Sequence, residues 1–346
     1  MARNKIFHEA GGVGSDPGIS TKTTTIMKKH PLTILSSILL AAASSGVAGT
    51  IVTQPVSPDT TSSNAFERAR RPISNPTLFD LALPQTNVHP IFMYQHLPSR
   101  VTTTAGPLIM GGDVQVYALQ FEIAFNERLS LVATKDGYVD FNPSSAAPWT
   151  SQSGFADIGL GLKYAFIYDP VNAFVVSGTA TYELPTGNSD VFQGQGDGML
   201  NLIVSGVKLW DQWQVAGGAG VRLPMNSQQS TGSFISGHVS YEVTPWFIPL
   251  VELNWHHVLE PGDGRANFSQ HAGGLTPVVA TFEGNDLLNF GAVNASQNRD
   301  LVTTAVGFRS RVSDQVDVGF AYEFPLTSDE KGIIEDRFTV DLVWRF

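Results

Sequence analysis

Strict alternation of residue types at the end of the chain constrains the fold more than any other feature. Between positions 336 and 346, apolar or aromatic residues alternate with a mainly charged and polar series. The apolar series is Phe338, Val340, Leu342, Trp344 and Phe346, and the other series is Arg337, Thr339, Asp341, Val343 and Arg345. Because a period of two places successive side chains on opposite faces of a strand, this segment predicts a β-strand with one greasy and one charged face.

The preceding segment, 315–324, repeats the pattern, which fits two kinds of protein. In a soluble sandwich the apolar face would pack into a core, whereas in a membrane barrel it would face lipid. Tyr322 and Phe324 end one strand, and Trp344 and Phe346 end the next, which runs the opposite way. Aromatic residues at opposite ends of adjacent strands are typical of the two interfacial girdles of a membrane barrel. The sequence therefore favours the barrel.

Composition narrows the classes further. After position 50 the chain has no uninterrupted apolar run of about 18 residues, which a membrane-spanning helix would need. The net charge is -10 and the body of the chain has no cluster of Lys and Arg, which argues against nucleic-acid binding. The absence of cysteine excludes a disulfide scaffold, a thiolate metal site and a lipid-modified N-terminal cysteine.

The N-terminal region has the order of a secretory signal. Two lysines follow Met27, then comes the apolar stretch 32–43, and then small residues up to Ala48. This order predicts a Sec-type signal peptide over residues 27–49, and an uncleaved anchor is less favoured because the apolar stretch is shorter than the about 20 residues of a span. Residues 1–26 show no such pattern, so we expect them to be a non-native extension whose deletion leaves export unchanged.

Beyond the signal the chain divides into an arm and a strand-rich region. Residues 50–86 are rich in Pro, Ser, Thr and Asn, and we expect a flexible periplasmic arm there. Over residues 87–346 period two dominates, and very short connections alternate with long ones, as in bacterial barrels with tight periplasmic turns and long outer loops. The expected strands are 88–97, 112–125, 129–140, 154–167, 172–184, 199–210, 213–223, 233–242, 246–259, 299–312, 315–325 and 335–346.

The predicted fold is all-β, a transmembrane antiparallel β-barrel of about 12 strands with both termini in the periplasm. Segment 286–293 also has strand character, but counting it would break the even parity, so we expect a loop element there. The surrounding loop, 260–298, keeps more apolar residues than a freely solvated loop would. We expect it either to fold over or into the outer mouth of the barrel, or to pack only against neighbouring loops.

Several short motifs resemble a known family, the outer-membrane barrel proteins named after the meta-pathway of phenol degradation. The likeness covers most of positions 88–346 and rests on degenerate motifs. They are Gly154-Phe-Ala-Asp-Ile-Gly-Leu-Gly-Leu-Lys-Tyr164, Glu183-Leu-Pro-Thr-Gly187, Gly196-Asp-Gly198, Trp210, Trp213, Gly217 to Gly220 and Leu223-Pro224. The resemblance implies a transporter-like, channel-forming barrel, often grouped with pathways for aromatic or other hydrophobic compounds, and it supplies no catalytic set.

Inward-facing residues set the selectivity of a barrel, and the alternation assigns a mixed set of charged and polar side chains to the lumen. The candidate lumen-lining residues are Asp157, Lys163, Glu183, Arg222, His238, Glu252, Asn254, His256, Arg309, Asp317, Glu323, Arg337 and Asp341. Because both signs are present, no preference for anions or cations is predicted. These residues could contact a solute, or could pair across the lumen and fill it, since an unpaired buried charge is costly.

No catalytic, cofactor-binding or metal site is expected. His256 and His257 lie near Glu252, but neighbours in a strand point to opposite faces, and no serine lies in a G-x-S-x-G turn. His238, Glu242 and His256 could meet across inward faces, yet rim histidines are more often hydrogen-bonded side chains than ligands. We therefore do not expect an enzyme, and an outer-membrane hydrolase is the weakest alternative.

The expected function is a porin-like channel or facilitator for passive passage of small, hydrophobic or aromatic solutes across the outer membrane of a Gram-negative bacterium. A structural or adhesive barrel with a filled lumen and partner-binding loops is the alternative. The expected partners are outer-membrane lipids, a small-molecule solute and the barrel-insertion machinery, for which Trp344 and Phe346 would form the assembly signal. The sequence leaves the solute and the oligomeric state open.

Overall fold

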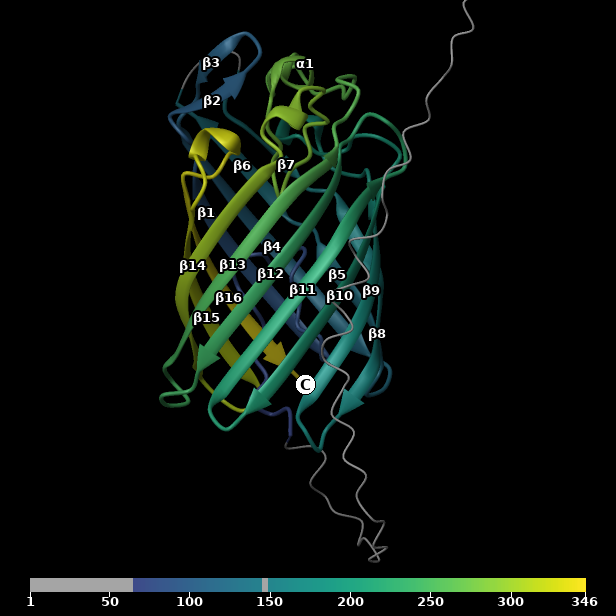
Figure 1. The fold of residues 1–346 in the computed structure, drawn as a ribbon, viewed down its shortest axis with the longest axis vertical. Coiled ribbons are helices and arrows are strands. Elements are labelled where there is room, and N and C mark those ends of the chain that lie inside the picture. The colour runs from purple at the N-terminus through teal and green to yellow at the C-terminus, as the bar shows by residue number, and fades with distance from the viewer. Residues whose placement is uncertain (1–64, 145–148) are drawn as a thin grey trace, which may run out of the picture. The chain divides into compact units, whose positions relative to one another are not determined.

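The computed structural model describes residues 65–144 and 149–346, and these form a β-barrel (Figure 1). The strands are β1 (Asn87–His96), β2 (Arg100–Thr103), β3 (Gly106–Ile109), β4 (Gly112–Ala124), β5 (Leu129–Lys135), β6 (Tyr138–Pro143), β7 (Gln152–Phe155), β8 (Ile158–Asp169), β9 (Phe174–Leu184), β10 (Met199–Trp210), β11 (Trp213–Pro224), β12 (Thr231–Tyr241), β13 (Ile248–Glu260), β14 (Asp300–Arg311), β15 (Val316–Pro325) and β16 (Asp336–Arg345). The short helices are η1 (Ser189–Val191), α1 (Thr276–Val279), η2 (Ala295–Gln297) and η3 (Asp329–Lys331).

The sheet closes on itself. From β8 to β16 each strand pairs antiparallel with the next, β16 pairs with β1, and β1 pairs with β4. β5 and β6 together form one wall strand beside β4, and β7 with β8 forms the next. The wall is therefore a closed antiparallel barrel of twelve strands, which confirms the predicted fold class. The remaining strands, β2 and β3, form a separate hairpin.

A sharp interruption separates β5 from β6. Gly137 has a φ of 124°, and a Cβ atom at this position would lie 2.7 Å from the carbonyl oxygen of Tyr117. Only glycine adopts this conformation at such close approach without strain. The wall strand therefore kinks here, where the sequence-based expectation had one regular strand over 129–140.

The two ends of the barrel differ in their connections. Tight connections join β4 to β5, β8 to β9, β10 to β11, β12 to β13 and β14 to β15, at the end where the C-terminus lies (Figure 1). The β2–β3 hairpin, α1 and the other long connections lie at the opposite end (Figure 1). We call these the turn end and the loop end, and this asymmetry is the one expected from the sequence.

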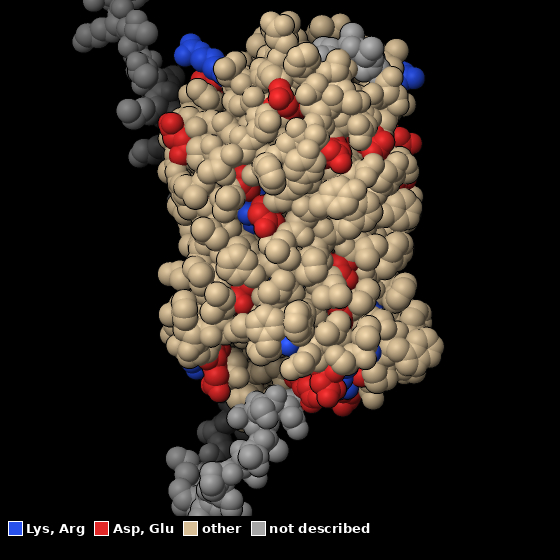
Figure 2. Space-filling model, turned by 180° about the vertical axis from the view of Figure 1, so that it is seen from behind, with Lys and Arg blue, Asp and Glu red and all other residues tan. Residues whose placement is uncertain are grey.

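The outer wall is apolar. Large exposed hydrophobic side chains cover it along the strands: Leu119, Ile123, Leu160, Leu162, Leu202, Val204, Ile235, Val239, Val251, Leu253, Val306 and Val340. Aromatic side chains are exposed near the turn end: Trp210, Trp213, Tyr241, Trp246, Phe247, Trp344 and Phe346. Figure 2 shows one face on which uncharged residues cover most of the wall and many of the acidic side chains gather at its lower end. Alternating strands and an aromatic rim of this kind match a lipid-facing surface.

Among residues 65–144 and 149–346, no helix is both long and apolar enough to cross a bilayer.

Residues 65–86 differ from the flexible periplasmic arm expected over 50–86. They run through the interior of the barrel before leading directly into β1, and many of their side chains are buried, including those of Arg70, Ile73, Leu78 and Phe79. We call this segment the plug. Its backbone forms no regular strand, so the polar groups of the plug bond instead to inward-facing side chains of the wall. The signal peptide and the extension expected over residues 1–49 lie outside the described residues.

The long connection between β13 and β14, residues 261–299, also enters the barrel, and we call it the inserted loop. Phe282, Leu288 and Phe290 of this loop are buried in one cluster with Val114 of β4 and Phe141 of β6. Segment 286–293 contains no strand, as predicted. The loop therefore folds into the outer mouth of the barrel rather than packing only against other loops.

Candidate functional site in the barrel lumen

The lumen is lined by the charged and polar face of the alternating strands. The structure buries every predicted lumen residue inside the barrel except His256, which is half-buried: Asp157, Lys163, Glu183, Arg222, His238, Glu252, Asn254, Arg309, Asp317, Glu323, Arg337 and Asp341. Most of them bond to one another, to the plug or to the inserted loop. Whether any of them contacts a solute stays a prediction.

The middle of the plug is held by β13. Glu252 accepts hydrogen bonds from the backbone N–H groups of Ile73 (2.9 Å) and Ser74 (2.7 Å). Asn254, two residues further along the same face, donates to the hydroxyl of Ser74 at 2.9 Å. Glu252 also bonds to His238 of β12 at 2.8 Å. Because backbone donors buried without partners are costly, these acceptors fix the position of the plug in the lumen.

A second group of charged side chains holds the plug at Arg71 and at Asp80. Lys163 of β8 pairs with Asp80 of the plug (2.5 Å) and with Glu122 of β4 (2.9 Å), and it donates to the carbonyl oxygen of Leu81. Arg71 of the plug pairs with the same two carboxylates, at 2.7 and 3.2 Å. The two cations and the two carboxylates balance, so this network buries charge without leaving any of it unpaired.

Arg309 of β14 joins the plug to the closing strand. Its guanidinium pairs with both oxygens of Asp341, at 2.9 and 2.7 Å, and its Nε donates to the carbonyl oxygen of Arg71 at 2.7 Å. Asp341 also bonds to His89 of β1 at 2.7 Å. This row crosses β14, β16 and β1, where the barrel closes.

Small residues of the wall make room for the plug. A Cβ atom on Gly218 of β11 would lie 2.9 Å from the ring of Phe79, and one on Gly319 of β15 would lie 2.7 Å from Ile73. Phe79 packs in a buried cluster with Val175 of β9 and other small or branched residues of the wall. The absence of side chains at these glycines therefore leaves space for Phe79 and Ile73 of the plug.

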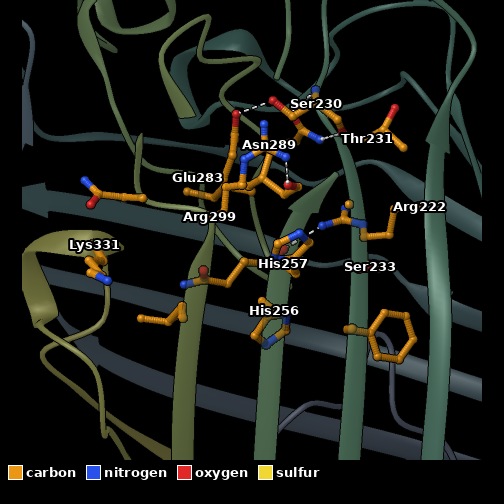
Figure 3. Close-up of a pocket in the computed structure, with 17 residues that line it drawn as sticks. Arg222, Ser230, Thr231, Ser233, His256, His257, Glu283, Asn289, Arg299 and Lys331 are labelled. Atoms are coloured by element: carbon orange, nitrogen blue, oxygen red, sulfur yellow. Dashed lines mark hydrogen bonds between the residues drawn. The ribbon is translucent and has the colours of Figure 1, made fainter. Parts of the chain in front are cut away.

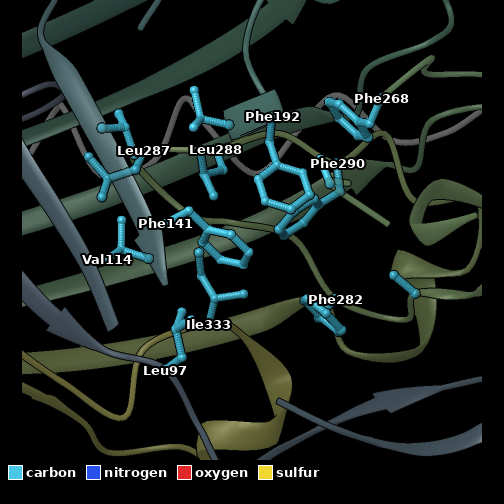
Figure 4. Packing of buried hydrophobic residues seen from close by; sticks show 14 of the residues in the cluster. Leu97, Val114, Phe141, Phe192, Phe268, Phe282, Leu287, Leu288, Phe290 and Ile333 are labelled. Atoms are coloured by element: carbon cyan, nitrogen blue, oxygen red, sulfur yellow. The ribbon is translucent and has the colours of Figure 1, made fainter. Parts of the chain in front are cut away.

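The inserted loop is held by one bidentate ion pair and an aromatic cluster. Asp286 accepts two hydrogen bonds from Arg337 of β16, at 2.9 and 2.8 Å. Arg337 also donates to the carbonyl oxygen of Ser74, so a single guanidinium contacts both the plug and the inserted loop. Figure 4 shows Phe290 beside Phe192, with Phe141 and Phe282 close by. Ring centroids of Phe192 and Phe290 are 5.0 Å apart in an edge-on arrangement, a favourable geometry for aromatic pairs.

Two small cavities lie between these segments and the wall in the described part of the chain, with volumes of about 40 and 30 Å³. A water molecule needs roughly 10 to 15 Å³ measured in this way, so each cavity has room for only a few waters or one small chemical group. The plug and the inserted loop therefore occupy the lumen in this conformation.

The remaining predicted residues lie in smaller groups. Glu183 bonds to Lys135 at 2.7 Å and lies 3.5 Å from Arg222, and Asp317 pairs with Arg345 at 2.6 Å. In the last two groups, Asp157 accepts from the backbone of the loop 185–198, and Glu323 accepts from Asn254 and Thr303.

Sequence reasoning missed the contributions of the first strands and of the plug. His89, Gln95, Gln120, Glu122 and Lys135 are all buried inward-facing residues. The alternation that identified the other strands also runs through these, so the same criterion could have found them. The signal for the plug was weaker: Ile73, Leu78, Phe79, Leu81 and Leu83 make 73–83 more apolar than a solvated arm.

One row of side chains has the order of a hydrolase triad. Ser240 bonds to His238 at 2.9 Å, and His238 bonds to Glu252 at 2.8 Å. All three are buried, and Glu252 also binds the plug backbone, so in this conformation the row anchors the plug.

Within the described residues no group of His, Asp and Glu side chains is arranged to hold a metal ion. His257, which follows His256 in β13, pairs with Asp300 of β14 at 2.8 Å rather than with Glu252.

Comparison with known proteins supports the fold. No family model matches the chain, and no curated protein matches it either, so the family suggested by the motifs stays a prediction. Among solved structures, the chain is similar to the COG4313 outer membrane channel from Pseudomonas putida F1, with 14% identity over 76% of this chain and 96% of that one and a TM-score of 0.52. Further matches are the NanC porin (6% identity, 75% of this chain, 100% of that one, TM-score 0.45) and the KdgM porin in complex with disordered oligogalacturonate (10%, 74%, 99%, 0.41). The first likeness shows that this chain has the fold of an outer-membrane β-barrel.

Proposed function

We propose that this chain is an outer-membrane channel for the passive passage of small, hydrophobic or aromatic solutes, and that the plug and the inserted loop close it. The apolar outer wall and the aromatic rim at the turn end support a location in the outer membrane. The resemblance of the strand motifs to the phenol meta-pathway family supports the class of solute.

One observation carries the channel interpretation: separate chain segments, rather than the side chains of the wall, fill the lumen. Barrels of about eight strands are filled by their own side chains, and barrels of 16 to 18 leave an aqueous channel. With twelve strands this barrel has space to spare, and the plug and the inserted loop occupy it. Each segment is joined to the wall only by non-covalent contacts and its chain ends, so either segment can leave without breaking the barrel.

The main alternative is a structural or adhesive barrel whose lumen is permanently filled. The buried ion pairs favour it, because Arg71, Lys163, Asp80 and Glu122 would each lose a partner if the plug left. Removing one partner of a buried pair typically costs about 3 to 5 kcal/mol. The two functions therefore differ in one property, the ability of the plug to move.

A reversible cross-link between plug and wall tests this property in the full-length chain. The Oγ of Ser74 and the Nδ2 of Asn254 are 2.9 Å apart, and the chain has no cysteine of its own. The double variant Ser74→Cys/Asn254→Cys therefore carries one pair of thiols. Planar-bilayer recordings of the oxidised form should show a closed barrel, and reduction should restore the conductance steps of the parent chain.

The single variant Ser74→Cys is the matched control and should conduct equally under both conditions. Equal conductance of the oxidised and reduced double variant, with the disulfide verified, would show that the plug does not gate the pore. A parent chain that gives no conductance steps at all would support the filled structural barrel. Swelling of proteoliposomes in phenol and in sugars of similar size would then rank the solutes.

A further inference from the structure

One of the two small cavities, with a volume of about 40 Å³, lies where the loop ends of β11, β12 and β13 meet the inserted loop. Arg222 of β11, His256 of β13 and Asn285 of the inserted loop are among the residues that line it. Figure 3 shows the Arg222 guanidinium reaching from β11 toward the side on which His256 and His257 lie. This cavity therefore lies beside the outer entrance to the lumen.

Two buried hydrogen-bond donors at this cavity have no partner within the described part of the chain. One is the Nε–H of Arg222, whose side chain is only 6% exposed, and the other is the side-chain amide nitrogen of Asn285. The other groups of Arg222 are engaged: one terminal nitrogen donates to the carbonyl oxygen of Asn285 at 2.6 Å, and the other lies 3.5 Å from Glu183. Both atoms belong to residues that line the cavity. Since buried donors without partners are costly, these two residues are suited to a ligand that brings acceptors.

The charge around the cavity also favours an anion. Three cations line it, Arg222, Arg299 and Lys331, and the only acidic lining residue is Glu283. Both oxygens of Glu283 are occupied, because they accept from Ser230 and from two backbone N–H groups of the inserted loop. Burial raises the pKa of Glu283.

The rest of the wall is apolar. Phe234 of β12, Leu301 of β14 and Leu288 of the inserted loop complete the lining. The volume of about 40 Å³ accepts one compact charged group, and an apolar body attached to that group is accommodated only if Leu288 of the inserted loop moves away from Phe234 and Leu301. Hydrogen bonds from a guanidinium to a carboxylate are among the strongest in proteins.

We infer that this cavity is a binding site for the carboxylate group of a small organic acid with an apolar body, held by Arg222 and Asn285. This inference rests on the proposed channel function and narrows its solutes to small organic carboxylates. It places a recognition site at the junction of the inserted loop and the wall, so the ligand contacts the segment that closes the outer mouth.

Calorimetric titration of the detergent-solubilised full-length protein tests the site without requiring conduction. The probes are benzoate, phenol as a neutral analogue of the same ring, and inorganic phosphate. Benzoate should bind, and phenol should bind at least about tenfold more weakly, because loss of a charge-assisted hydrogen bond costs tenfold or more in affinity. Phosphate binding without benzoate binding, or equal binding of benzoate and phenol, would overturn the inference.

Two variants assign the binding to the named donors. Arg222→Gln should weaken benzoate binding at least about tenfold. Asn285→Gly removes only the side-chain amide, and it keeps the backbone because Asn285 has a φ of 60° that glycine adopts freely. Arg128→Gln removes one positive charge in an exposed turn between β4 and β5 and should bind benzoate as the parent does.

Folding of each variant is checked by its heat-modifiable mobility in gels. If Arg222→Gln fails to fold, Asn285→Gly still decides, and unchanged benzoate affinity of a folded Asn285→Gly would remove Asn285 from the site. Failure of the two proposals can be told apart: benzoate binding in a barrel that never conducts sinks the channel, whereas conductance without benzoate binding sinks only this site.

Discussion

The ion pair between Asp286 and Arg337 should decide how tightly the inserted loop stays docked, and Asp286→Asn tests it with little change of shape. Losing one partner of a buried pair costs about 3 to 5 kcal/mol. Here Arg337 keeps its bond to Gln95 and its contact with Glu323, and the new amide can still accept one hydrogen bond. We therefore expect the docked loop to lose about 2 kcal/mol, which is roughly a 30-fold shift of the docking equilibrium.

Hydrogen exchange of backbone amides, measured by mass spectrometry, follows this equilibrium. Peptides from the inserted loop should exchange about 30-fold faster in Asp286→Asn, while peptides from β10 and β11 should be unaffected, because local opening is reported only by the segment that opens. Asp263→Asn is the control, because Asp263 lies in the same loop but its carboxylate is exposed. That carboxylate accepts hydrogen bonds from the hydroxyl of Ser227 and the backbone N–H of Arg265. Unchanged exchange in Asp286→Asn would refute the role of the ion pair.

Acid should release the same loop. Burial alone would raise the pKa of Asp286, but the Arg337 guanidinium outweighs it and holds that pKa below its ordinary value. The stabilisation is therefore present above the ordinary pKa of an aspartate, about 4, and is lost as the pH falls through the lowered value. After correction for intrinsic exchange rates, the part of the loop protection that depends on Asp286, obtained as the difference between the parent chain and Asp286→Asn, should stay flat from pH 7 to about 4 and fall below that. In Asp286→Asn the total protection should fall less than in the parent chain.

Three further changes probe the aromatic cluster, the plug seat and assembly. Phe290→Ala should destabilise the docked loop by about 3 to 5 kcal/mol, because the ring contacts Phe192, Phe268 and Phe282, and loop exchange measures it. Gly218→Val should expel Phe79 and expose a cysteine placed at Ser74 to maleimide, whereas Gly237→Val, where a Cβ atom meets nothing within 4 Å, should leave it protected. Phe346→Asp should reduce heat-modifiable barrel in the membrane while secretion continues, and normal barrel levels would count against the assembly signal.

The wall of the barrel was predictable because each strand carries its own evidence. Alternation in segments such as 315–324 is a local signal, and it gives both the strand and the face that each side chain joins. The twelve expected strands therefore match the twelve strands of the wall within a few residues, apart from the interruptions between β5 and β6 and between β7 and β8, and the β2–β3 hairpin was not expected. The sequence also indicated that the apolar side chains of the inserted loop need cover from water, but it left open whether the barrel mouth or the neighbouring loops supply that cover.

The plug could not be placed in the same way. It has no periodic pattern, and its partners are distant in sequence: Ile73 binds Glu252, and Ser74 binds Asn254 and Arg337. Each contact is specified by the shape of the assembled lumen rather than by neighbouring residues. The sequence predicted Arg222 as a lumen residue. It could not show that the Nε–H of Arg222 lacks a partner, because this depends on how the inserted loop docks beside it.

The position of the plug directly before β1 has a consequence for the order in which the molecule forms. The plug precedes every strand of the wall, whereas β16, which supplies Arg337 and Asp341 around it, is the last. Contacts that span most of the chain are slow to form, because they require closure of a very long loop. The final pairing of β16 with β1 either closes the barrel around a plug already inside, or precedes entry of the plug through the turn end, from which residues 65–86 lead into β1. In the first order, Arg337 and Asp341 meet the plug only as the last strand pairs, so docking of the plug and closure of the barrel are completed in one step.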